Sequence, residues 1–395
     1  MSINIYEAER LKHVSFSGIR KVVDAVTDLE GKGETIIHME LGRPDFDTPE
    51  HIKKATKKAL DDGLVHYCSN YGLPELRKAI AFKLIQENNI PVTPEEIIVT
   101  SGATEAIFLS MFAVLDPGDE ILIPEPAFGV FHQCAYLAGA KPISVPLKAE
   151  NGFKIQVEEL EKQITSKTKM IVVNTPNNPT GIVYDEELLR QITEFAQRHD
   201  LLVISDEIYE KTIFDNNKHI SLASFPNMKE RTFTVNGFTK SYAMDGWRLG
   251  YLAADHKFVS SLIRAHQYIN VSICTFAQKG AVTAIESSQD CVEDMVKEYS
   301  DRKNLVVNKL KEMGLPTVEP KGTFFAFPDI TSLGMSSEQA SNYFLKDAKV
   351  ATVPGNCFGK AGEGLIRLSF SCSYSDLETG LKNMKRSVYK LKKPH

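Results

Sequence analysis

Residues 237–250 read GFTKSYAMDGWRLG and connect two apolar runs, residues 232–235 and 249–254. Each run has the length and composition of a buried strand, so Lys240 stands just past the end of the first strand, between small residues. Burial removes hydration from an amine, lowers its pKa and frees its lone pair for attack on a carbonyl carbon. The stretch therefore predicts a lysine that forms a Schiff base.

Arg248 lies eight positions beyond Lys240, between Gly246 and Gly250. Glycines let backbone or ligand atoms approach closely, and a guanidinium with open space around it can bind a phosphate through two hydrogen bonds. The plain alternative is a solvated lysine at a strand end and a surface arginine. As a whole, the stretch resembles the lysine-attachment signature of the class I aminotransferases, which bind pyridoxal 5'-phosphate (PLP).

The bulk properties of the chain exclude several classes of protein. With 395 residues it can fill one large and one smaller domain, because single cores rarely grow beyond about 300 residues. Its net charge of -5 gives no field that attracts nucleic acid or an anionic membrane. The six cysteines lack the spacing of metal ligands. Residues 1–12 lack the apolar core of a secretion signal, and no run approaches the ~18 apolar residues of a membrane span. We expect a cytoplasmic protein with reduced thiols, no bound metal and small-molecule partners.

Two apolar runs are followed by small or aromatic residues that suit a ligand. Residues 97–100 lead through residues 101–104 into an apolar helix, and the free amides at such a helix start can bind an anion. Residues 120–123 are followed by Phe128, which could be ordinary core or an apolar face for a flat ring.

Two further runs end in polar residues. Residues 170–173 run into a dense set of turn residues that fixes Asn178, whose amide can donate to a phenolate oxygen. Residues 201–205 end at Asp206, three positions before Tyr209. A carboxylate at the end of an apolar strand is costly to bury unless it meets a cation, which a protonated pyridine nitrogen would supply. The alternative for Asp206 is a helix N-cap.

Both ends of the chain offer further candidates. Residues 35–41 form a predicted strand that leads to Gly42, where a plain turn is the alternative to a ligand site. Arg367 is embedded in the apolar run 364–370 and needs an anion, because an unpaired buried cation is costly. Residues 354–361 imitate a nucleotide-binding P-loop, but one residue is missing between the glycines and no Ser or Thr follows the lysine, so we reject that site.

The resemblance extends from Gly42 to Arg367 and implies the fold type I architecture of PLP-dependent transferases. This is an α/β fold with a mostly parallel sheet, helices on both faces and a smaller α+β domain, which agrees with the alternation of strands and helices along the chain. The expected division is 1–46 for an N-terminal arm and part of the small domain, 47–287 for the large PLP-binding domain, and 288–395 for the rest of the small domain.

The resemblance also implies a role for each candidate residue. Lys240 would hold the cofactor as an imine and then act as the base that moves the α proton. Asp206 would keep the pyridine nitrogen protonated, while Asn178 and Tyr209 orient and stabilise the phenolate. The implied cofactor-binding residues are Gly102, Ala103, Thr104, Phe128, Asn178, Asp206, Tyr209, Thr239, Lys240, Arg248 and, from the neighbouring subunit of a homodimer, Tyr67. The implied substrate-binding residues are Gly42, Asn178 and Arg367, the last for the α-carboxylate.

One position departs from the family pattern. Many relatives carry a phosphate-binding serine three residues before the lysine, where this chain has Gly237. We expect Thr239 to supply the missing donor.

The implied activity is transfer of an amino group from an amino acid to a 2-oxo acid through the Lys240 Schiff base, with active sites shared in a homodimer. A PLP-dependent C-S β-lyase would use the same cofactor site and stays an alternative. A PLP-sensing regulator would need a DNA-binding module, which the sequence lacks. A purely structural α/β protein would not explain why Asp206, Lys240 and Arg367 all stand in apolar settings.

The amino donor is left open by the sequence. Relatives specific for dicarboxylic acids carry a second cation at the position of Tyr268 or of Thr104, and neither position is basic here. We therefore expect neutral or aromatic amino acids to be accepted at least as well as aspartate, with 2-oxoglutarate as the shared acceptor.

Overall fold

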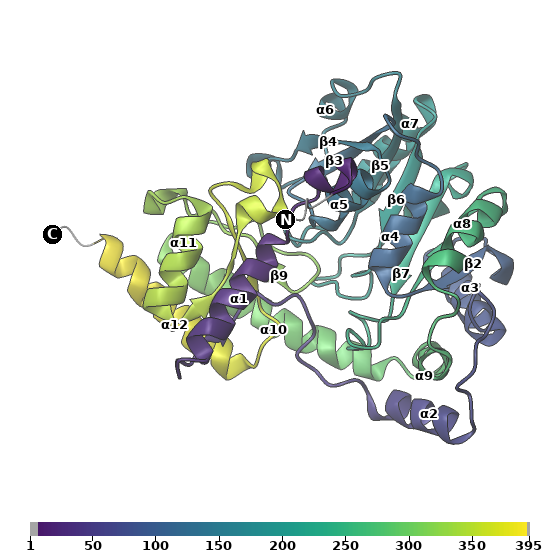
Figure 1. Ribbon diagram of the computed structural model, residues 1–395. Coiled ribbons are helices and arrows are strands. Elements are labelled where there is room, and N and C mark those ends of the chain that lie inside the picture. Colours follow the sequence, from purple (N-terminus) through teal and green to yellow (C-terminus); the bar gives the residue numbers. More distant parts are fainter. Residues whose placement is uncertain (1–6, 393–395) are drawn as a thin grey trace, which may run out of the picture.

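A seven-stranded sheet forms the centre of the larger part of the molecule in the computed structural model, which describes residues 7–392 (Figure 1). From one edge to the other, the strands are β2 (Ile97–Thr100), β8 (Gly250–Ala253), β7 (Thr232–Gly237), β6 (Leu202–Asp206), β5 (Thr168–Asn174), β3 (Glu120–Glu125) and β4 (Lys141–Pro146). Strand β8 runs antiparallel to both of its neighbours, and the other six share one direction.

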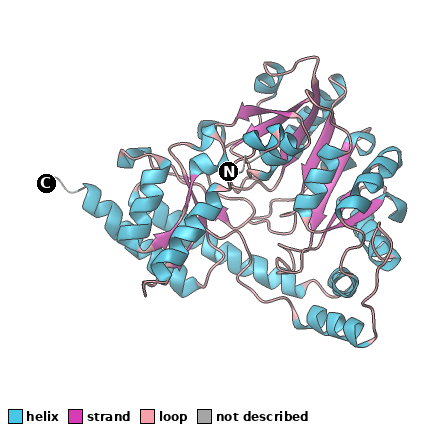
Figure 2. Ribbon diagram, in the orientation of Figure 1, coloured by secondary structure: helices cyan, strands magenta, loops and turns pink. Residues whose placement is uncertain are grey.

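Helices cover both faces of this sheet, as Figure 2 shows. Helices α4 (Ala103–Phe112), α5 (Val130–Leu137) and α8 (His256–Ile269) pack on one face. Helices α3 (Pro74–Asn88), α7 (Glu186–Arg198) and α9 (Thr275–Glu286) pack on the other, α9 also against α2 (Glu50–Asp61), and the short α6 (Val157–Glu161) lies beside α7. Because both faces are covered, the inner strands read as continuous apolar runs rather than as alternating ones.

The smaller part of the molecule combines the two ends of the chain. Strand β1 (Ile37–His38) pairs with β10 (Val350–Ala351), and β11 (Val353–Pro354), β12 (Ile366–Ser369) and β9 (Phe325–Ala326) form an antiparallel sheet. Helices α1 (Gly18–Glu30), α11 (Ser337–Tyr343) and α12 (Tyr374–Lys392) surround these strands, and α10 (Asp290–Met313) extends to them from the neighbourhood of α9 (Figure 1).

The predicted α/β fold with a mostly parallel sheet is confirmed, and two element predictions need correction. The expected strand over residues 35–41 shrinks to Ile37–His38, because β10 offers partners to these two residues alone. The strand expected from the apolar run 364–370 is assigned over Ile366–Ser369, and single contacts of Leu365 with Asp329 and of Phe370 with Phe324 continue it by one residue at each end. Within residues 7–392, no helix is long and apolar enough to cross a membrane.

Candidate active site

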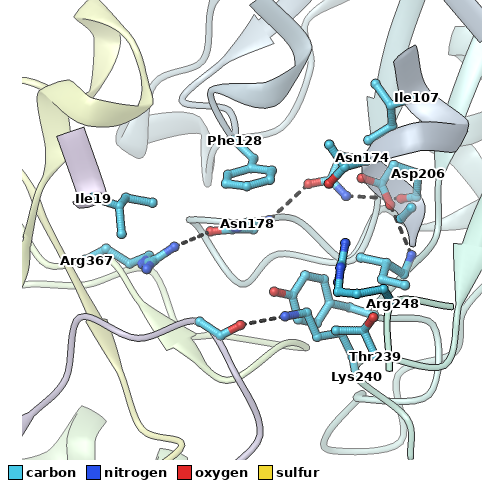
Figure 3. A pocket seen from close by; sticks show the side chains of 15 residues that line it. Ile19, Ile107, Phe128, Asn174, Asn178, Asp206, Thr239, Lys240, Arg248 and Arg367 are labelled. Carbon is cyan, nitrogen blue, oxygen red and sulfur yellow. Dashed lines mark hydrogen bonds between the residues drawn. The ribbon is translucent and has the colours of Figure 1, made fainter. Parts of the chain in front are cut away.

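The side chains predicted to bind ligands meet above the carboxyl ends of the parallel strands of the seven-stranded sheet. Strands β2, β3, β5, β6 and β7 all end there, and β8 begins there because it runs in the opposite direction. A cavity of about 290 Å³ lies here, with walls from both parts of the molecule (Figure 3). Its lining residues are Ile19, Gly42, Ala103, Thr104, Ile107, Phe128, Asn174, Asn178, Asp206, Ile208, Tyr209, Thr239, Lys240, Arg248 and Arg367. All of the predicted site residues except Gly102 and Tyr67 are among them.

Lys240 reaches into the cavity from the turn after β7. Its Nζ donates a hydrogen bond to the carbonyl oxygen of Gly42 at 2.5 Å. Burial is the main cause that lowers the pKa of this amine to about 8; nearby Arg367 and Arg248 lower it further, and Asp245 and Asp206 act against them. A substantial share of the Lys240 side chains is therefore neutral near pH 8, as a nucleophile or a base requires.

Asp206 is 5% exposed and lies at the carboxyl end of β6. Its Oδ1 accepts the backbone N–H of Ile208 at 3.1 Å, but this bond closes a turn and no helix begins here, so the N-cap alternative is wrong. Burial above all raises the pKa of the carboxyl to about 7, with a further contribution from the charge of Glu207, while the Ile208 N–H and Lys240 lower it. A carboxyl held in such a place is suited to a cationic ligand.

Asn178 and Tyr209 offer hydrogen-bond donors to the same space. The Asn178 Oδ1 accepts from Arg367 Nη1 at 3.0 Å, which leaves its amide N–H groups as donors toward the cavity. Burial raises the pKa of Tyr209 far above its ordinary value, so its hydroxyl keeps its proton and can donate. The Tyr209 ring is fixed edge-on by Phe324 and Phe325, at centroid distances of 5.5 and 5.9 Å.

Asn174 is a site residue that the sequence analysis missed. It is the last residue of β5, its Oδ1 accepts the backbone N–H of Asn178 at 3.1 Å, and its Nδ2 donates to the Asp206 carbonyl at 3.0 Å (Figure 3). It thereby ties the ends of β5 and β6 together. The signal was present in the sequence, since Asn174 is the polar residue that ends an apolar strand.

The start of α4 and Arg248 lie side by side and offer donors that suit an anion. Gly102 has φ +77° and precedes the free N–H groups of Ala103 and Thr104, and a Cβ on Gly102 would lie 2.4 Å from Arg248 Nη2. A Cβ on Gly250 would lie 2.7 Å from the Ala103 nitrogen, so glycine is required at both places for the guanidinium to lie against the helix start.

Gly246 does not fit the expected close approach, and Gly237 has a packing reason of its own. A Cβ on Gly246 would meet no atom within 4 Å, so close approach explains Gly250 but not Gly246. A Cβ on Gly237 would lie 2.8 Å from the Leu249 carbonyl oxygen and 2.9 Å from the Gly250 Cα. The serine of many relatives therefore has no room in this chain, while Thr239 lines the cavity two residues later.

Arg367 is 1% exposed and extends from β12. Besides the bond to Asn178, its Nη2 donates to the Glu40 carbonyl at 2.7 Å, and its Nε has no partner. Its guanidinium packs on the rings of Phe325 and Phe358, at 4.2 and 5.0 Å from the centroids. Burial lowers its pKa to about 10, and its hydrogen bonds within the described residues go to an amide oxygen and a backbone carbonyl rather than to a carboxylate. A buried guanidinium without an anion is suited to a carboxylate ligand.

Tyr67 does not join the cavity from within its own chain. Its side chain is 84% exposed, and Val65 nearby in the sequence and Tyr268 and Val271 of a second segment are exposed as well. The segment that carries Tyr67 and the segment that carries Tyr268 are joined by hydrogen bonds from the Cys68 N–H to Ser272 Oγ and from Asn70 Nδ2 to the Val271 carbonyl.

Comparison with known proteins gives a consistent result. The family model for aminotransferase class I and II matches residues 34–383. The aspartate aminotransferase of Pyrococcus abyssi (strain GE5 / Orsay) is 47% identical over 96% of this chain and 97% of its own. The aromatic-amino-acid aminotransferase 2 of Thermococcus litoralis is 46% identical over 98% and 99%. Among solved structures, the aspartate aminotransferase from Thermus thermophilus with maleate has a TM-score of 0.93 at 35% identity, covering 97% of this chain and 100% of that one.

Proposed function

Because the chain belongs to the class I and II aminotransferase family, we propose that its cavity holds pyridoxal 5'-phosphate beside a substrate amino acid and that Lys240 is the catalytic base. The protein is an aminotransferase, and enzymes of this family use PLP. The main support for the site is a pair of buried groups of opposite charge in one cavity, the Asp206 carboxyl and the Arg367 guanidinium, neither of which forms a salt bridge with another described residue. A pyridinium nitrogen and a substrate carboxylate would complement them.

The lining residues fit the groups of PLP. The start of α4 and Arg248 suit the phosphate, Asp206 the ring nitrogen, and Asn178 Nδ2 with the Tyr209 hydroxyl the phenolate oxygen. Phe128 offers an apolar face to the ring (Figure 3). When bound, the cofactor supplies an electrophilic carbon for the amino group and a ring that withdraws electrons.

Lys240 is the group that moves protons. A pKa of about 8 lets its Nζ attack a carbonyl carbon, and later accept a proton from the substrate's α-carbon and return it, near neutral pH. The Gly42 carbonyl at 2.5 Å orients the amine.

Arg367 binds the substrate's α-carboxylate in this proposal. Asn178 and the Glu40 carbonyl fix its two terminal nitrogens, so the planar guanidinium is oriented before a substrate arrives. A Cβ at Gly42 would lie 3.8 Å from Arg367 Nη2, and glycine there keeps the space beside the guanidinium open.

The cavity favours neutral and aromatic side chains at least as much as a second carboxylate. Its three cations, Lys240, Arg248 and Arg367, already have roles, and the remaining wall includes the apolar Ile19 and Ile107. One of the similar proteins is named an aspartate aminotransferase and another an aromatic-amino-acid aminotransferase. We propose a broad range of donors, with 2-oxoglutarate as acceptor.

The test is a half-reaction screen, in which the PLP-loaded enzyme meets one amino acid at a time while the cofactor spectrum is followed. The ratio of kcat/KM for aspartate to that for phenylalanine should stay below about 100. A larger ratio would mean that an unlocated cation contributes roughly 3 kcal/mol to the transition state. Release of pyruvate and ammonia from a cysteine conjugate, without transfer to an oxo acid, would favour the β-lyase alternative instead.

We also propose that the enzyme is a cytoplasmic homodimer in which Tyr67 contacts the cofactor phosphate of the other subunit. The support is the exposure of Val65, Tyr67, Tyr268 and Val271 on two segments that hydrogen bonds join at residues 68–70 and 271–272, because exposed apolar side chains that lie near one another are typical of an interface. The six free cysteines fit a reducing compartment.

A further inference from the structure

The loop between β11 and β12 belongs to the smaller part of the molecule but contacts the end of β3 in the large sheet. It consists of two short 3-10 turns, Gly355–Phe358 and Lys360–Gly362, and it is the stretch that imitates a P-loop in the sequence. The Ala127 N–H, two residues beyond β3, donates to the Phe358 carbonyl at 2.9 Å. The loop leads directly into β12, which carries Arg367.

Glu125, the last residue of β3, holds this loop. Its Oε1 accepts from Ser144 Oγ at 2.6 Å and pairs with His132 Nε2 at 2.8 Å, and the backbone N–H of Ala361 lies where it helps to lower the pKa of the carboxylate. It lies directly against Gly359, where a Cβ would be 2.3 Å from the carboxylate carbon. Three elements, α5, β4 and the loop, therefore converge on one carboxylate.

The carboxylate keeps its charge although Glu125 is only 5% exposed. Burial raises the pKa of Glu125, but the hydrogen bonds from His132 and Ser144 and the Ala361 N–H outweigh burial, so the pKa lies below its ordinary value. A buried anion with a full set of donors resists displacement, because any shift would leave a charge unpaired.

Phe358 is the residue of the loop that contacts Arg367. The Phe358 ring is 1% exposed and lies 5.0 Å from the Arg367 Cζ, one of the two rings on which the guanidinium packs. A displaced loop would remove one of the two rings that hold the guanidinium, so Phe325 and the bonds to Asn178 and the Glu40 carbonyl would hold it less firmly against tilting.

We propose that Glu125 is a positioning residue for the substrate carboxylate: it fixes the loop 355–365 against β3 and thereby sets where the Arg367 guanidinium lies. The inference rests on the proposed carboxylate-binding role of Arg367. Glu125 does not line the cavity, so its effect should appear in carboxylate binding and not in the chemical step.

The experiment compares Glu125→Gln with Glu120→Gln in the PLP-loaded enzyme. Glu120 is the matched control, because it lies on the same strand, is equally buried at 5% and accepts from Thr165 Oγ1 at 2.6 Å and Lys141 Nζ at 3.0 Å, but at the far end of β3. The probe is 3-phenylpropionate, a carboxylate without an amino group, whose binding is read from the cofactor's absorbance. Glu125→Gln should raise its Kd and the KM for phenylalanine about tenfold, as expected for a lost charge-assisted bond, with kcat changed by less than about threefold. The affinity of the protein for PLP itself should not change.

Equal Kd values in the Glu125 and Glu120 variants would overturn the proposal, as would a fall in kcat at unchanged KM. If Glu125→Gln does not fold, Ser144→Ala removes one bond to the same carboxylate and should raise the Kd by about threefold in the same direction. Arg367→Gln tests the carboxylate-binding role of Arg367 separately from the positioning role of Glu125. If it loses the probe while Glu125→Gln binds normally, only the positioning role is wrong; if it also binds normally, the role of Arg367 and this inference both fail.

Discussion

Replacing Asp206 by asparagine should make the cofactor-free protein more stable while it weakens cofactor binding and catalysis. Asp206 is 5% exposed, and its folded-state pKa of about 7 lies above the ordinary value of 3.8. The folded protein therefore binds the proton more tightly than the unfolded chain, and its stability falls as the pH rises between these two values.

The size of the effect follows from the same two values. At 1.36 kcal/mol for each pH unit, the difference between a pKa of 3.8 and one of about 7 lowers the free energy of unfolding by roughly 4 kcal/mol at pH 8. Asp206→Asn should recover this amount at pH 8. At pH 5.5 only about 2 kcal/mol remains, because the native carboxyl is then protonated and only the unfolded chain ionises. Asparagine carries no charge, and its Oδ1 can still accept the Ile208 N–H.

The assay is urea unfolding of the cofactor-free protein at fixed concentration, at pH 8 and at pH 5.5, with and without added PLP. The matched control is Asp255→Asn. Asp255 is also 5% exposed and accepts the N–H two residues on, from Lys257 at 3.1 Å, but it caps α8 away from the cavity. The Asp255 variant should be neutral or slightly less stable at both pH values and should bind PLP normally.

Catalysis by Asp206→Asn should fall at the same time. Removing the charged partner of a buried cation is worth about 3–5 kcal/mol, or roughly 10²–10⁴ in kcat/KM. An Asp206 variant that is less stable than wild type at pH 8, or that keeps its affinity for PLP, would refute the view that this carboxyl is held ready for a cation.

Three other predictions address neighbouring parts of the site. In the cofactor-free protein, the rate at which trinitrobenzenesulfonate modifies Lys240 should rise with a midpoint near pH 8; a midpoint above pH 10, as for a solvated lysine, would contradict the buried amine. A heterodimer of a Tyr67→Ala chain and a Lys240→Ala chain has one site with both residues, and its activity should exceed that of either parent; a confirmed heterodimer without this gain argues against shared sites. Gly250→Ala should lower stability by about 1–3 kcal/mol and weaken PLP binding, because its methyl group would overlap the start of α4, whereas Gly246→Ala should leave both unchanged.

The strands and their ligand-bearing ends could be predicted because composition identifies them. The inner strands β5 and β6 are covered on both faces and read as apolar runs, so a polar residue at the end of such a run is conspicuous; Asp206 was identified in this way, and Asn174 carries the same signal but was overlooked. Strand β4 was missed for the opposite reason. It is an edge strand with two prolines and mixed exposure, so neither an apolar run nor a clean alternation marks it.

Contacts between distant segments could not be predicted from one sequence. Arg367 could be identified as a buried cation, but its partners Asn178 and the Glu40 carbonyl lie 189 and 327 residues away along the chain. The same holds for Glu125, whose donors come from α5, β4 and the loop beyond β11. Local pattern indicates that a charge needs a partner, and only the fold supplies the partner.

The glycines around Lys240 show why a motif needs a physical reason for each position. The pattern Gly-x-Arg-x-Gly suggests one cause, open space beside Arg248, yet the backbone packs tightly against Gly250 and leaves Gly246 free. Gly237 has a third reason: it faces Gly250 across the β7 and β8 pair, where the two backbones leave no room for a side chain. That close pairing brings β8 against the start of α4, and the left-handed φ of +54° at Arg248 turns the chain into β8 with the guanidinium beside Gly102. The absence of a serine at Gly237 and the position of the Arg248 guanidinium are therefore parts of one packing arrangement, and Thr239, two residues beyond β7, lines the cavity with a hydroxyl that Gly237 cannot supply.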